Sequence, residues 1–404
     1  MSSVRQMPPV DDQLAVLMSG VDYGDAGTRR QMESELRARL EEDRPLRVYL
    51  GIDPTAPSLT LGHTVPLRKL RQFQELGHKA VFLIGDYTAL IGDPSDKNKL
   101  RPMLTEEDTK VNEATYFQQA ARFLDSSATE VRHNSEWLGS LSLPDIIQLM
   151  SKFTVAEMLR RETFRRRFGE GDAVYLHEFL YALMQGYDAF ALECDVQVGG
   201  TEQLFNLMAG RKIQQDASQR PHVPLTLPIL VGLDGKERMS KSKGNHIGVD
   251  DSVDEQYGKI MSLPDAAVMD FFTLATNVRR SELANLSQLL ERNPLEAKKL
   301  LARTIAGEFH GADEAAAAQG RFEKTIQRGE VPADMPEIAA PLGKLLIDII
   351  LEAGLAQSKR EARRLFDQGA VSVEGTVVDS RAEAVPGTAV QVGKRRWLRL
   401  VSEV

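Results

Sequence analysis

The segment between Leu46 and Gly85 restricts the possible folds more than any other part of the sequence. LRVYLGI (46–52) is a compact apolar run, VPLRKLRQFQEL (65–76) has apolar residues at helical spacing, and KAVFLIG (79–85) is a second apolar run. A strand, a helix and a strand in close succession form a βαβ unit, which predicts a parallel sheet. Because ligands of open parallel sheets bind at the carboxyl ends of the strands, we expect the active site in the loops that follow these two strands.

Later patterns extend this sheet and add a helical region. DVQVGG (195–200) and LTLPILV (225–231) predict further strands. Helical spacing covers the segments 105–124, 144–167, 175–192 and almost all of 252–328. We therefore expect an α/β, Rossmann-like catalytic domain over residues 1–250, followed by an α-helical domain over residues 251–330.

The end of the sequence predicts a separate small module. Prolines are frequent around residues 331–340, which makes this segment the best candidate for a linker. Beyond it, LGKLLIDIILEAG and KREARRLFDQG have the pattern of two helices, and short strands follow, with a turn at Glu374-Gly375. Residues 341–404 should form a small α+β module that is more basic than the rest of the chain.

Composition excludes several classes of protein. The 404 residues are 42% apolar, which is enough for two or three domains of roughly 150 residues each. The chain has neither a signal-like N-terminus nor an apolar run of about 18 residues, so we expect a cytoplasmic protein. Cys194 is the single cysteine and cannot form an intrachain disulfide or a structural zinc site, so we predict no tightly bound metal. The net charge of −8 argues against indiscriminate coating of nucleic acid.

Two loop segments carry most of the predicted chemistry: GIDPTAPSLTLGHT (51–64) and ERMSKSKGN (237–245). They resemble the HIGH and KMSKS signatures of class I aminoacyl-tRNA synthetases. In the first segment, a helix N-terminus after a strand favours phosphate binding. Gly62 and His63 match the family pattern, whereas Thr60 replaces its first histidine. The resemblance implies that ATP, accompanied by Mg²⁺, is a substrate, and that Thr60 and His63 are catalytic.

The second segment, Arg238-Met239-Ser240-Lys241-Ser242, departs from its signature only at Arg238, which preserves the positive charge. Loop-like flanks allow its cations to follow charge that develops on departing pyrophosphate. The resemblance implies that Arg238 and Lys241 are catalytic and that Met239, Ser240, Lys241 and Ser242 lie at ATP.

Other positions follow from the same resemblance. The segment 91–101 is similar to the family loop that makes Lys97 and Arg101 candidates for catalytic contact with phosphate. Further ATP-binding candidates are Gly51, Asp53, Thr55, Gly62, Gly200 and Glu202. Glu202 departs from the aspartate that is common at its position.

A polar face on the helix 175–192 indicates the amino acid substrate. Tyr181, Gln185 and Asp188 follow one another at helical spacing and lie on one face. Together with Tyr49 and the turn 199–203, this face resembles the tyrosine pocket of tyrosyl-tRNA synthetases. The resemblance implies that Tyr49 and Asp188 bind the phenol and that Asp93, Tyr181 and Gln185 hold the α-ammonium group. It also makes Gln203 a contact to tyrosine.

The terminal module resembles the S4 RNA-binding domain. The residues that this resemblance brings to RNA are Ser358, Lys359, Arg360, Arg363, Arg364, Lys394, Arg395 and Arg396. A second basic cluster at residues 160–167 has two readings, a solvated helix face or a phosphate contact.

Taken over nearly the whole chain, the resemblance implies a tyrosine–tRNA ligase. Such an enzyme activates L-tyrosine with ATP to tyrosyl-adenylate, releases pyrophosphate and transfers tyrosine to the 3′ end of tRNA(Tyr), as a homodimer. The alternatives are a tryptophanyl-tRNA synthetase, a nucleotidylyltransferase, and a non-catalytic RNA-binding protein on the same fold. Tyr49 with Asp188 and the S4-like module argue against the first of these, and Asp93, Asp188 and Lys241 argue against the last.

Overall fold

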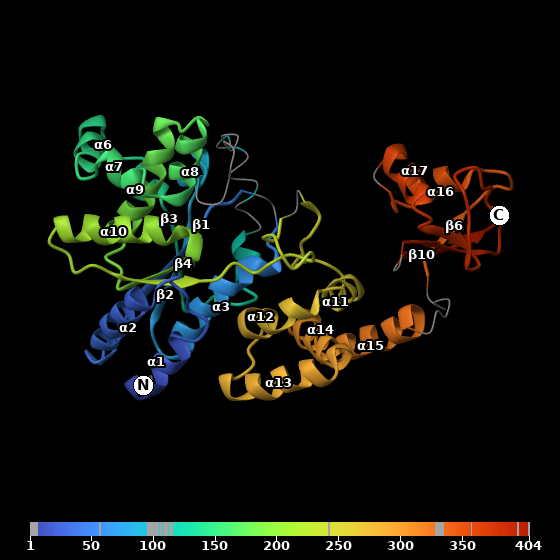
Figure 1. Cartoon of the computed structure of the whole chain (residues 1–404), viewed down its shortest axis with the longest axis horizontal. Coiled ribbons are helices and arrows are strands. Elements are labelled where there is room, and N and C mark those ends of the chain that lie inside the picture. Colours follow the sequence, from blue (N-terminus) through green and yellow to red (C-terminus); the bar gives the residue numbers. More distant parts are fainter. Residues whose placement is uncertain are drawn as a thin grey trace. The chain divides into compact units, whose positions relative to one another are not determined.

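The computed structural model describes residues 7–55, 58–94, 105, 107, 112, 116–240, 243–327, 335–356, 358–393 and 396–402. The chain divides into two compact units (Figure 1). The first unit contains Met1–Asp250 and Leu263–Pro294, and the second contains Asp251–Ser262 and Leu295–Val404. The predicted domain boundaries at residues 250, 330 and 340 stay predictions.

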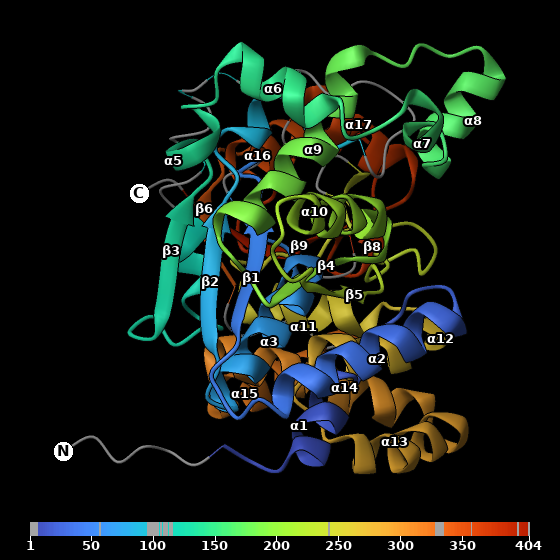
Figure 2. The same ribbon diagram turned by 90° about the vertical axis from the view of Figure 1, so that its left-hand side faces the viewer.

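The first unit is built on a parallel sheet with the strand order β3-β2-β1-β4-β5. The strands are β1 (Arg47–Ile52), β2 (Lys79–Ile84), β3 (Thr129–His133), β4 (Val196–Gly200) and β5 (Val223–Leu227). The order reverses between β1 and β4, so the carboxyl ends of these two strands form the usual crevice for a ligand. In Figure 2, the arrowheads of β1 and β3 point toward the end of the unit where α5 (Ser135–Leu138) and α6 (Leu143–Met150) lie. The predicted Rossmann-like sheet is confirmed.

Helices cover both faces of this sheet. The remaining helices and short turns of the first unit are α1 (Val10–Leu17), α2 (Ala26–Leu40), α3 (Leu61–Glu75), η1 (Thr88–Leu90), α7 (Val155–Met158), α8 (Glu162–Glu170), α9 (Leu176–Ala191), η2 (Thr201–Gln203), α10 (Leu204–Asp216), α12 (Asp265–Ala275) and α13 (Arg280–Arg292). The connection through α3 runs from β1 to β2, and the connection through α10 runs from β4 to β5. These two steps go in opposite directions, so right-handed crossovers place α3 and α10 on opposite faces.

The predicted elements differ from the observed ones where the apolar pattern is weak or interrupted. Helix α3 begins at Leu61, before the predicted start at residue 65, and it ends before Gly77, whose φ of 97° is left-handed. The predicted helix 144–167 is divided into α6, α7 and the first part of α8. The predicted strand 225–231 begins at Val223 and stops at Leu227, just before Pro228. In the predicted helix 105–124, residues 106, 108–111 and 113–115 lie outside the described residues.

The second unit contains a helical part and a small sheet. Its elements are α11 (Val253–Met261), α14 (Pro294–His310), α15 (Ala312–Phe322), η4 (Glu323–Gln327), β6 (Glu337–Ala339), α16 (Leu346–Glu352), α17 (Lys359–Asp367), β7 (Val371–Val373), β8 (Thr376–Val377), β9 (Ala389–Val392) and β10 (Arg396–Val401). The strand order is β6-β10-β9-β7-β8. Strand β6 lies inside the segment predicted as a linker and pairs in parallel with β10.

The predicted terminal module therefore has the expected two helices and sheet. Its core includes Ile349 and Ile350 of α16, Phe366 of α17 and Leu398 and Leu400 of β10, all buried. The predicted turn forms at Glu374 and Gly375, which have φ of 47° and 79° and so suit a tight hairpin. No helix in the described part of the chain is both long and apolar enough to cross a membrane.

Candidate active site

A pocket of the first unit lies at the carboxyl ends of the strands and brings most of the predicted site residues together. The predicted residues that line it are Tyr49, Gly51, Asp53, Thr55, Thr60, Gly62, His63, Asp93, Tyr181, Gln185, Asp188, Gly200, Glu202, Gln203, Arg238 and Met239. Ser240 is described but is absent from this lining. The predicted contacts of Lys97, Arg101, Lys241 and Ser242 lie outside the described residues.

The phenol-binding candidates Tyr49 and Asp188 are both buried. The hydroxyl of Tyr49, on β1, has no hydrogen-bond partner among the described residues. Burial raises the pKa of this phenol well above its usual value. Burial also raises the pKa of the Asp188 carboxyl, on α9, although hydrogen bonds from Trp137 and Asn134 oppose this rise. A partner for the Tyr49 hydroxyl would remove the cost of burying it alone.

Asn134 and Trp137 support Asp188 and were absent from the predicted site. Trp137 Nε1 donates to Asp188 Oδ1 at 2.8 Å, and Asn134 Nδ2 donates to Asp188 Oδ2 at 3.3 Å. Both residues follow β3, whose sequence TEVRH has no apolar alternation and whose side chains are half-buried. Because its sequence pattern does not predict a strand, the sequence does not predict that Asn134 and Trp137 lie at the pocket.

The predicted ammonium-binding residues each take part in a side-chain hydrogen bond. Asp93 Oδ2 accepts from Gln203 Nε2 at 3.4 Å, and Tyr181 donates its hydroxyl to Asp53 Oδ2 at 2.9 Å. Gln185 Oε1 accepts from the side-chain amide of Asn206 at 2.8 Å. These contacts fix polar atoms at the same pocket that contains Asp188.

The basic cluster at residues 160–167 is divided between surface and interior. Arg161 is buried, lies 3.4 Å from Asp93 Oδ1 and stacks over the ring of Phe164. Arg167 is also buried, and it pairs with Glu178 at 2.6 Å. The reading of a wholly solvated face is therefore wrong for Arg161 and Arg167, because each has a carboxylate partner in the interior.

The first signature segment forms the N-terminus of α3. The backbone N–H of Thr60 donates to His63 Nδ1 at 3.1 Å, and Thr60 Oγ1 lies 2.9 Å from the same nitrogen. Because a backbone N–H can only donate, Nδ1 accepts, and the neutral ring carries its proton on Nε2. Thr60 therefore orients His63 as a donor. At Gly62, an added Cβ would approach Thr60 no closer than 3.6 Å, so the protein itself leaves room at this position.

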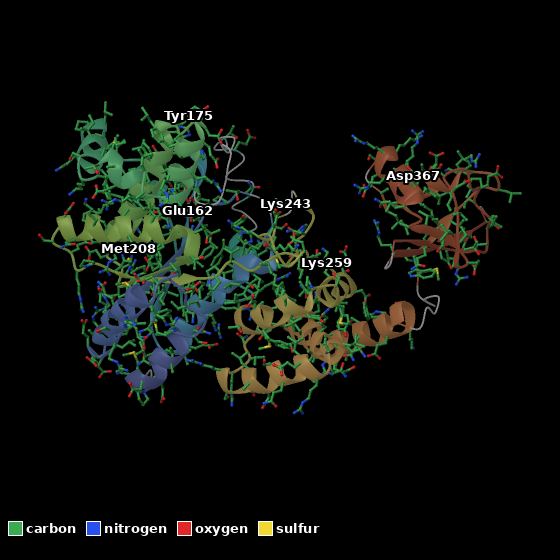
Figure 3. All side chains as sticks on the ribbon, in the orientation of Figure 1. Glu162, Tyr175, Met208, Lys243, Lys259 and Asp367 are labelled. Carbon is green, nitrogen blue, oxygen red and sulfur yellow. The ribbon has the colours of Figure 1, made fainter. Side chains whose placement is uncertain are left out.

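Hydrogen bonds join the residues at the base of the second signature segment. Ser240 N donates to Asn245 Oδ1 at 2.8 Å, while Asn245 Nδ2 donates to Asp234 Oδ2 at 2.8 Å and to the carbonyl of Arg238 at 3.2 Å. We call Asp234, Arg238, Ser240 and Asn245 the loop-base cluster. It holds both ends of the segment together on either side of residues 241–242. Lys243, labelled in Figure 3, pairs with Glu237 at the surface.

A short backbone ladder joins the first signature segment to the residues that follow the second one. Leu61 N donates to the carbonyl of Ile247 at 2.9 Å, and Val249 N donates to the carbonyl of Leu59 at 3.2 Å. Segments that are far apart in the sequence thus lie side by side at one edge of the pocket. The residues that follow the second segment are therefore anchored at the N-terminus of α3.

Glu202 lines the pocket and has a perturbed carboxyl. Its pKa is raised to about 7, mainly by burial and to a smaller extent by the nearby Asp93, while a backbone hydrogen bond and Arg161 oppose the rise. Its Oε2 has no hydrogen-bond partner among the described residues, and its Oε1 lies 4.0 Å from Arg238. A carboxylate with free acceptor capacity at this point could accept hydrogen bonds from a sugar hydroxyl.

Helix α17 of the second unit presents the predicted RNA-binding residues. Ser358 caps the helix through the Glu361 N–H at 3.2 Å. The exposed residues predicted here are Ser358, Lys359, Arg360, Arg363, Arg364 and, on β10, Arg396. Lys394 and Arg395 lie outside the described residues. The described part of the chain contains no group of His, Cys, Asp and Glu side chains arranged to hold a metal ion.

Two sequence families match separate parts of the chain. Residues 41–327 match the family described as tRNA synthetases class I (W and Y), and residues 346–390 match the S4 domain. A tyrosine–tRNA ligase of Symbiobacterium thermophilum is 47% identical over 401 residues, which cover 97% of this chain and 98% of the relative. A tyrosine–tRNA ligase of Haemophilus ducreyi is 47% identical over 372 residues, which cover 91% and 94% of the two chains.

Solved structures share the fold. A C-terminally truncated mitochondrial tyrosyl-tRNA synthetase of Aspergillus nidulans has a TM-score of 0.61 at 24% identity, covering 80% of this chain and 94% of that one. The tyrosyl-tRNA synthetase of Archaeoglobus fulgidus, complexed with L-tyrosine, has a TM-score of 0.60 at 24% identity, covering 77% and 100%. With the sequence relatives and both domain matches, the chain belongs to the tyrosine–tRNA ligases, a family of class I aminoacyl-tRNA synthetases, and it carries an S4 domain.

Proposed function

We propose that this chain binds L-tyrosine and ATP in the pocket of the first unit, forms tyrosyl-adenylate and transfers tyrosine to the 3′ end of tRNA(Tyr). One observation carries the proposal. The buried hydroxyl of Tyr49 and the carboxylate of Asp188 lie in the same pocket that both signature segments line. A phenol would supply the partner that the Tyr49 hydroxyl does not have among the described residues.

The polar groups of the pocket suit the two ends of tyrosine. The substrate phenol donates to Asp188 and accepts from Tyr49, and its α-ammonium group is held by Asp93, Tyr181 and Gln185. Gln203, which donates to Asp93, lies at the same end. Phenylalanine would leave Asp188 and Tyr49 without this partner in the interior, and this cost discriminates against it.

Adenylate formation needs no protein nucleophile. The tyrosine carboxylate attacks the α-phosphorus of ATP, and the bond to the leaving pyrophosphate breaks. The N-terminus of α3 and the Nε2–H of His63 stabilise phosphate charge, and Glu202 accepts from the ribose. The cations of the second signature, Arg238 and Lys241, follow the charge onto pyrophosphate.

The remaining ATP contacts complete this arrangement. We assign them to Gly51, Asp53, Thr55, Thr60, Gly62, Gly200, Met239, Ser240 and Ser242, with phosphate contacts from Lys97 and Arg101. Mg²⁺ arrives with ATP as part of the substrate, and its charge shields the phosphates during attack.

Transfer to tRNA involves the second unit. The exposed cations of α17, with Arg396 and the neighbouring Lys394 and Arg395, contact the phosphate backbone of tRNA(Tyr). We assign the anticodon to the α-helical domain over residues 251–330. A terminal ribose hydroxyl of the tRNA then attacks the carbonyl carbon of the adenylate and releases AMP.

We further propose a homodimer. Large apolar side chains are exposed on α6 to α9 of the first unit, including Leu143, Ile147, Val155, Phe168 and Leu176. These helices lie together at one end of the unit in both ribbon views, and Figure 3 labels Tyr175 there. A second copy that covers these side chains would remove them from water. The cytoplasmic location stays a prediction.

The alternative functions are not favoured. Relatives that match this chain over nearly its full length at 44–47% identity are tyrosine–tRNA ligases. A tryptophanyl-tRNA synthetase would require a pocket for an indole, whereas this pocket places Asp188 and Tyr49 where a hydroxyl is needed.

Aminoacylation tests the proposal. The chain is expected to attach labelled tyrosine to a tRNA(Tyr) transcript in the presence of ATP and Mg²⁺. Arg363→Glu combined with Arg364→Glu should lower kcat/KM for tRNA at least about tenfold, because repulsion replaces phosphate contacts. Arg381→Glu in the same module, where Arg381 pairs with Asp379, serves as the control. Failure to charge the transcript with tyrosine would contradict the proposed function.

A further inference from the structure

A chain of hydrogen bonds runs along the lining of the pocket from Asp188 to Asp53. Asn134 Nδ2 donates to Asp188 Oδ2 at 3.3 Å and to Thr88 Oγ1 at 2.9 Å. Thr88 Oγ1 in turn donates to Asp53 Oδ1 at 2.8 Å. We call Asp188, Asn134, Thr88 and Asp53 the pocket chain. It joins a residue of α9 to the loop that follows β1.

The direction of each bond in the pocket chain is fixed. The backbone N–H of Tyr87 donates to Asn134 Oδ1 at 2.9 Å, so the Asn134 amide group must turn its NH₂ toward Asp188 and Thr88. The Thr88 hydroxyl accepts from this NH₂ and has one proton to give. Asp53 is its nearer acceptor, because the Gly85 carbonyl lies at 3.2 Å. Each carboxylate therefore receives a donor from the chain.

Tight packing holds the pocket chain in place. Asn134 is fully buried and Thr88 is 2% exposed. A Cβ at Gly85 would lie 2.1 Å from Asp53 Oδ1 and 2.5 Å from Thr88 Oγ1, so only glycine allows these two oxygens to meet. A buried network in which every member has a partner is rigid, and its bonds strengthen one another at low dielectric.

The two ends of the pocket chain belong to different parts of the reaction. Asp188 is the proposed acceptor for the substrate phenol, whereas Asp53 borders the nucleotide and accepts from the Tyr181 hydroxyl at 2.9 Å. We propose that Thr88 and Asn134 are positioning residues that transmit the phenol contact of tyrosine to Asp53, so that adenylate formation responds to the substrate hydroxyl. This inference rests on the proposed function.

The physical reason is competition for hydrogen bonds at Asp188. A phenol that donates to Asp188 competes with Asn134 for the same carboxylate acceptor. A shift of the Asn134 amide changes its hydrogen bond to Thr88 and, through Thr88, the hydrogen bond that Thr88 donates to Asp53. The phenol lies at the far end of the substrate from the reacting carboxylate. Binding energy from such a remote group increases the rate only when it is coupled to the reacting end, and the pocket chain supplies that coupling.

Single-turnover adenylate formation, with enzyme in excess over the amino acid, tests this coupling. The assay gives a rate constant for tyrosine and also for phenylalanine, which reacts slowly and has no phenol hydroxyl. Thr88→Val removes the hydroxyl and keeps the shape of the side chain. With tyrosine, the rate constant should fall at least about tenfold while the tyrosine Kd changes less than threefold. With phenylalanine, the rate constant should fall less than threefold, so the ratio of the tyrosine rate constant to the phenylalanine rate constant decreases.

Two variants serve as controls. Thr88→Ser keeps the hydroxyl and should restore the tyrosine rate to within threefold of the unmodified chain. Thr276→Val removes another buried threonine hydroxyl, which donates to the Phe272 carbonyl on α12, and should leave both rates unchanged. If Thr88→Val fails to fold, Thr88→Ala gives the same comparison without adding bulk beside Asp53.

The outcomes separate the two proposals. Equal losses with tyrosine and phenylalanine, or no loss with either, would overturn the role of the pocket chain in an otherwise active enzyme. An unmodified chain that forms no adenylate with tyrosine would overturn the proposed function itself.

Discussion

Tyr49 has opposite consequences for folding and for substrate binding. Its buried hydroxyl has no partner among the described residues, so Tyr49→Phe should raise the free energy of unfolding of the ligand-free chain by about 1 kcal/mol. The same change removes a hydrogen bond to the phenol and should weaken tyrosine binding about tenfold, or roughly 1.4 kcal/mol. Denaturant unfolding and equilibrium dialysis measure the two effects.

Tyr23 offers a matched control for this prediction. Its buried hydroxyl donates to the Pro224 carbonyl at 2.6 Å, so Tyr23→Phe should lower the free energy of unfolding and leave tyrosine affinity unchanged. If Tyr49→Phe destabilises the ligand-free chain as Tyr23→Phe does, the Tyr49 hydroxyl has a partner in the protein and is not reserved for substrate.

Glu202 makes both stability and ATP binding depend on pH. Its folded pKa of about 7 lies above the ordinary value of 4.5. Between these two values the unfolded chain releases the proton and the folded chain keeps it, so this group lowers stability as pH rises through the window. Glu202→Gln lacks the penalty, so its stability relative to the unmodified chain should increase from pH 5 to pH 7.5, as thermal unfolding would measure.

The same titration should appear in catalysis. The ribose contact needs the ionised carboxylate, so the KM for ATP of the unmodified chain should fall as pH rises from 6 to 8. The KM of Glu202→Gln should be higher and insensitive to pH over this range. A KM for ATP that is the same in both proteins at pH 8 would argue against a ribose contact.

At the level of elements, the loop-base cluster determines how the second signature segment can move. Asn245→Ala removes the acceptor for Ser240 N and the donor to Asp234. Because the segment acts on the leaving pyrophosphate, the rate of adenylate formation should fall at least about tenfold, while the tyrosine Kd stays within threefold. Rapid-quench kinetics and equilibrium dialysis distinguish these effects.

An exchange of side chains provides the control. Asp234→Asn combined with Asn245→Asp preserves a donor–acceptor pair between the two positions and the acceptor for Ser240 N, so it should recover part of the lost rate. If the double variant forms adenylate no faster than Asn245→Ala, the loop-base cluster does not act through the pair of Asp234 and Asn245.

Much of the fold could be predicted because its apolar runs are strong. Strands β1 and β2 are buried on both faces and read as continuous apolar segments. Strand β3 lies at the sheet edge with half-buried side chains, so TEVRH gave no pattern. Strand β6 is three residues long and depends on pairing with β10, a long-range contact that local sequence does not encode.

The same distinction explains which site residues could be predicted. The pocket residues that belong to recognisable motifs, such as His63 and Asp188, were identified from sequence and lie together in the structure. Asn134 and Thr88 belong to no motif, and their importance comes only from the contacts that the sheet creates. The sequence left two readings for the cluster that contains Arg161, a solvated face or a phosphate contact, and neither predicts the burial of Arg161 beside Asp93.

At the scale of the whole molecule, the exposed apolar side chains on α6 to α9 predict a dimer. Leu176 is 80% exposed, so Leu176→Asp should cost the monomer little stability but place a charge in the interface. Sedimentation velocity should show a dimer for the unmodified chain and a dimer–monomer Kd at least about 100-fold higher for the variant. Leu342→Asp changes an equally exposed leucine of the second unit and should leave the dimer intact. A monomeric unmodified chain would refute the interface.

Tyrosine-dependent exchange of labelled pyrophosphate into ATP tests the central claim most directly. The assay uses the full chain with Mg²⁺ and without tRNA, and each of the twenty amino acids is supplied separately. Exchange with tyrosine, and far weaker exchange with phenylalanine, is the expected result, because only a phenol satisfies Tyr49 and Asp188 together. Exchange with tryptophan in place of tyrosine, or no exchange with any amino acid, would contradict the account.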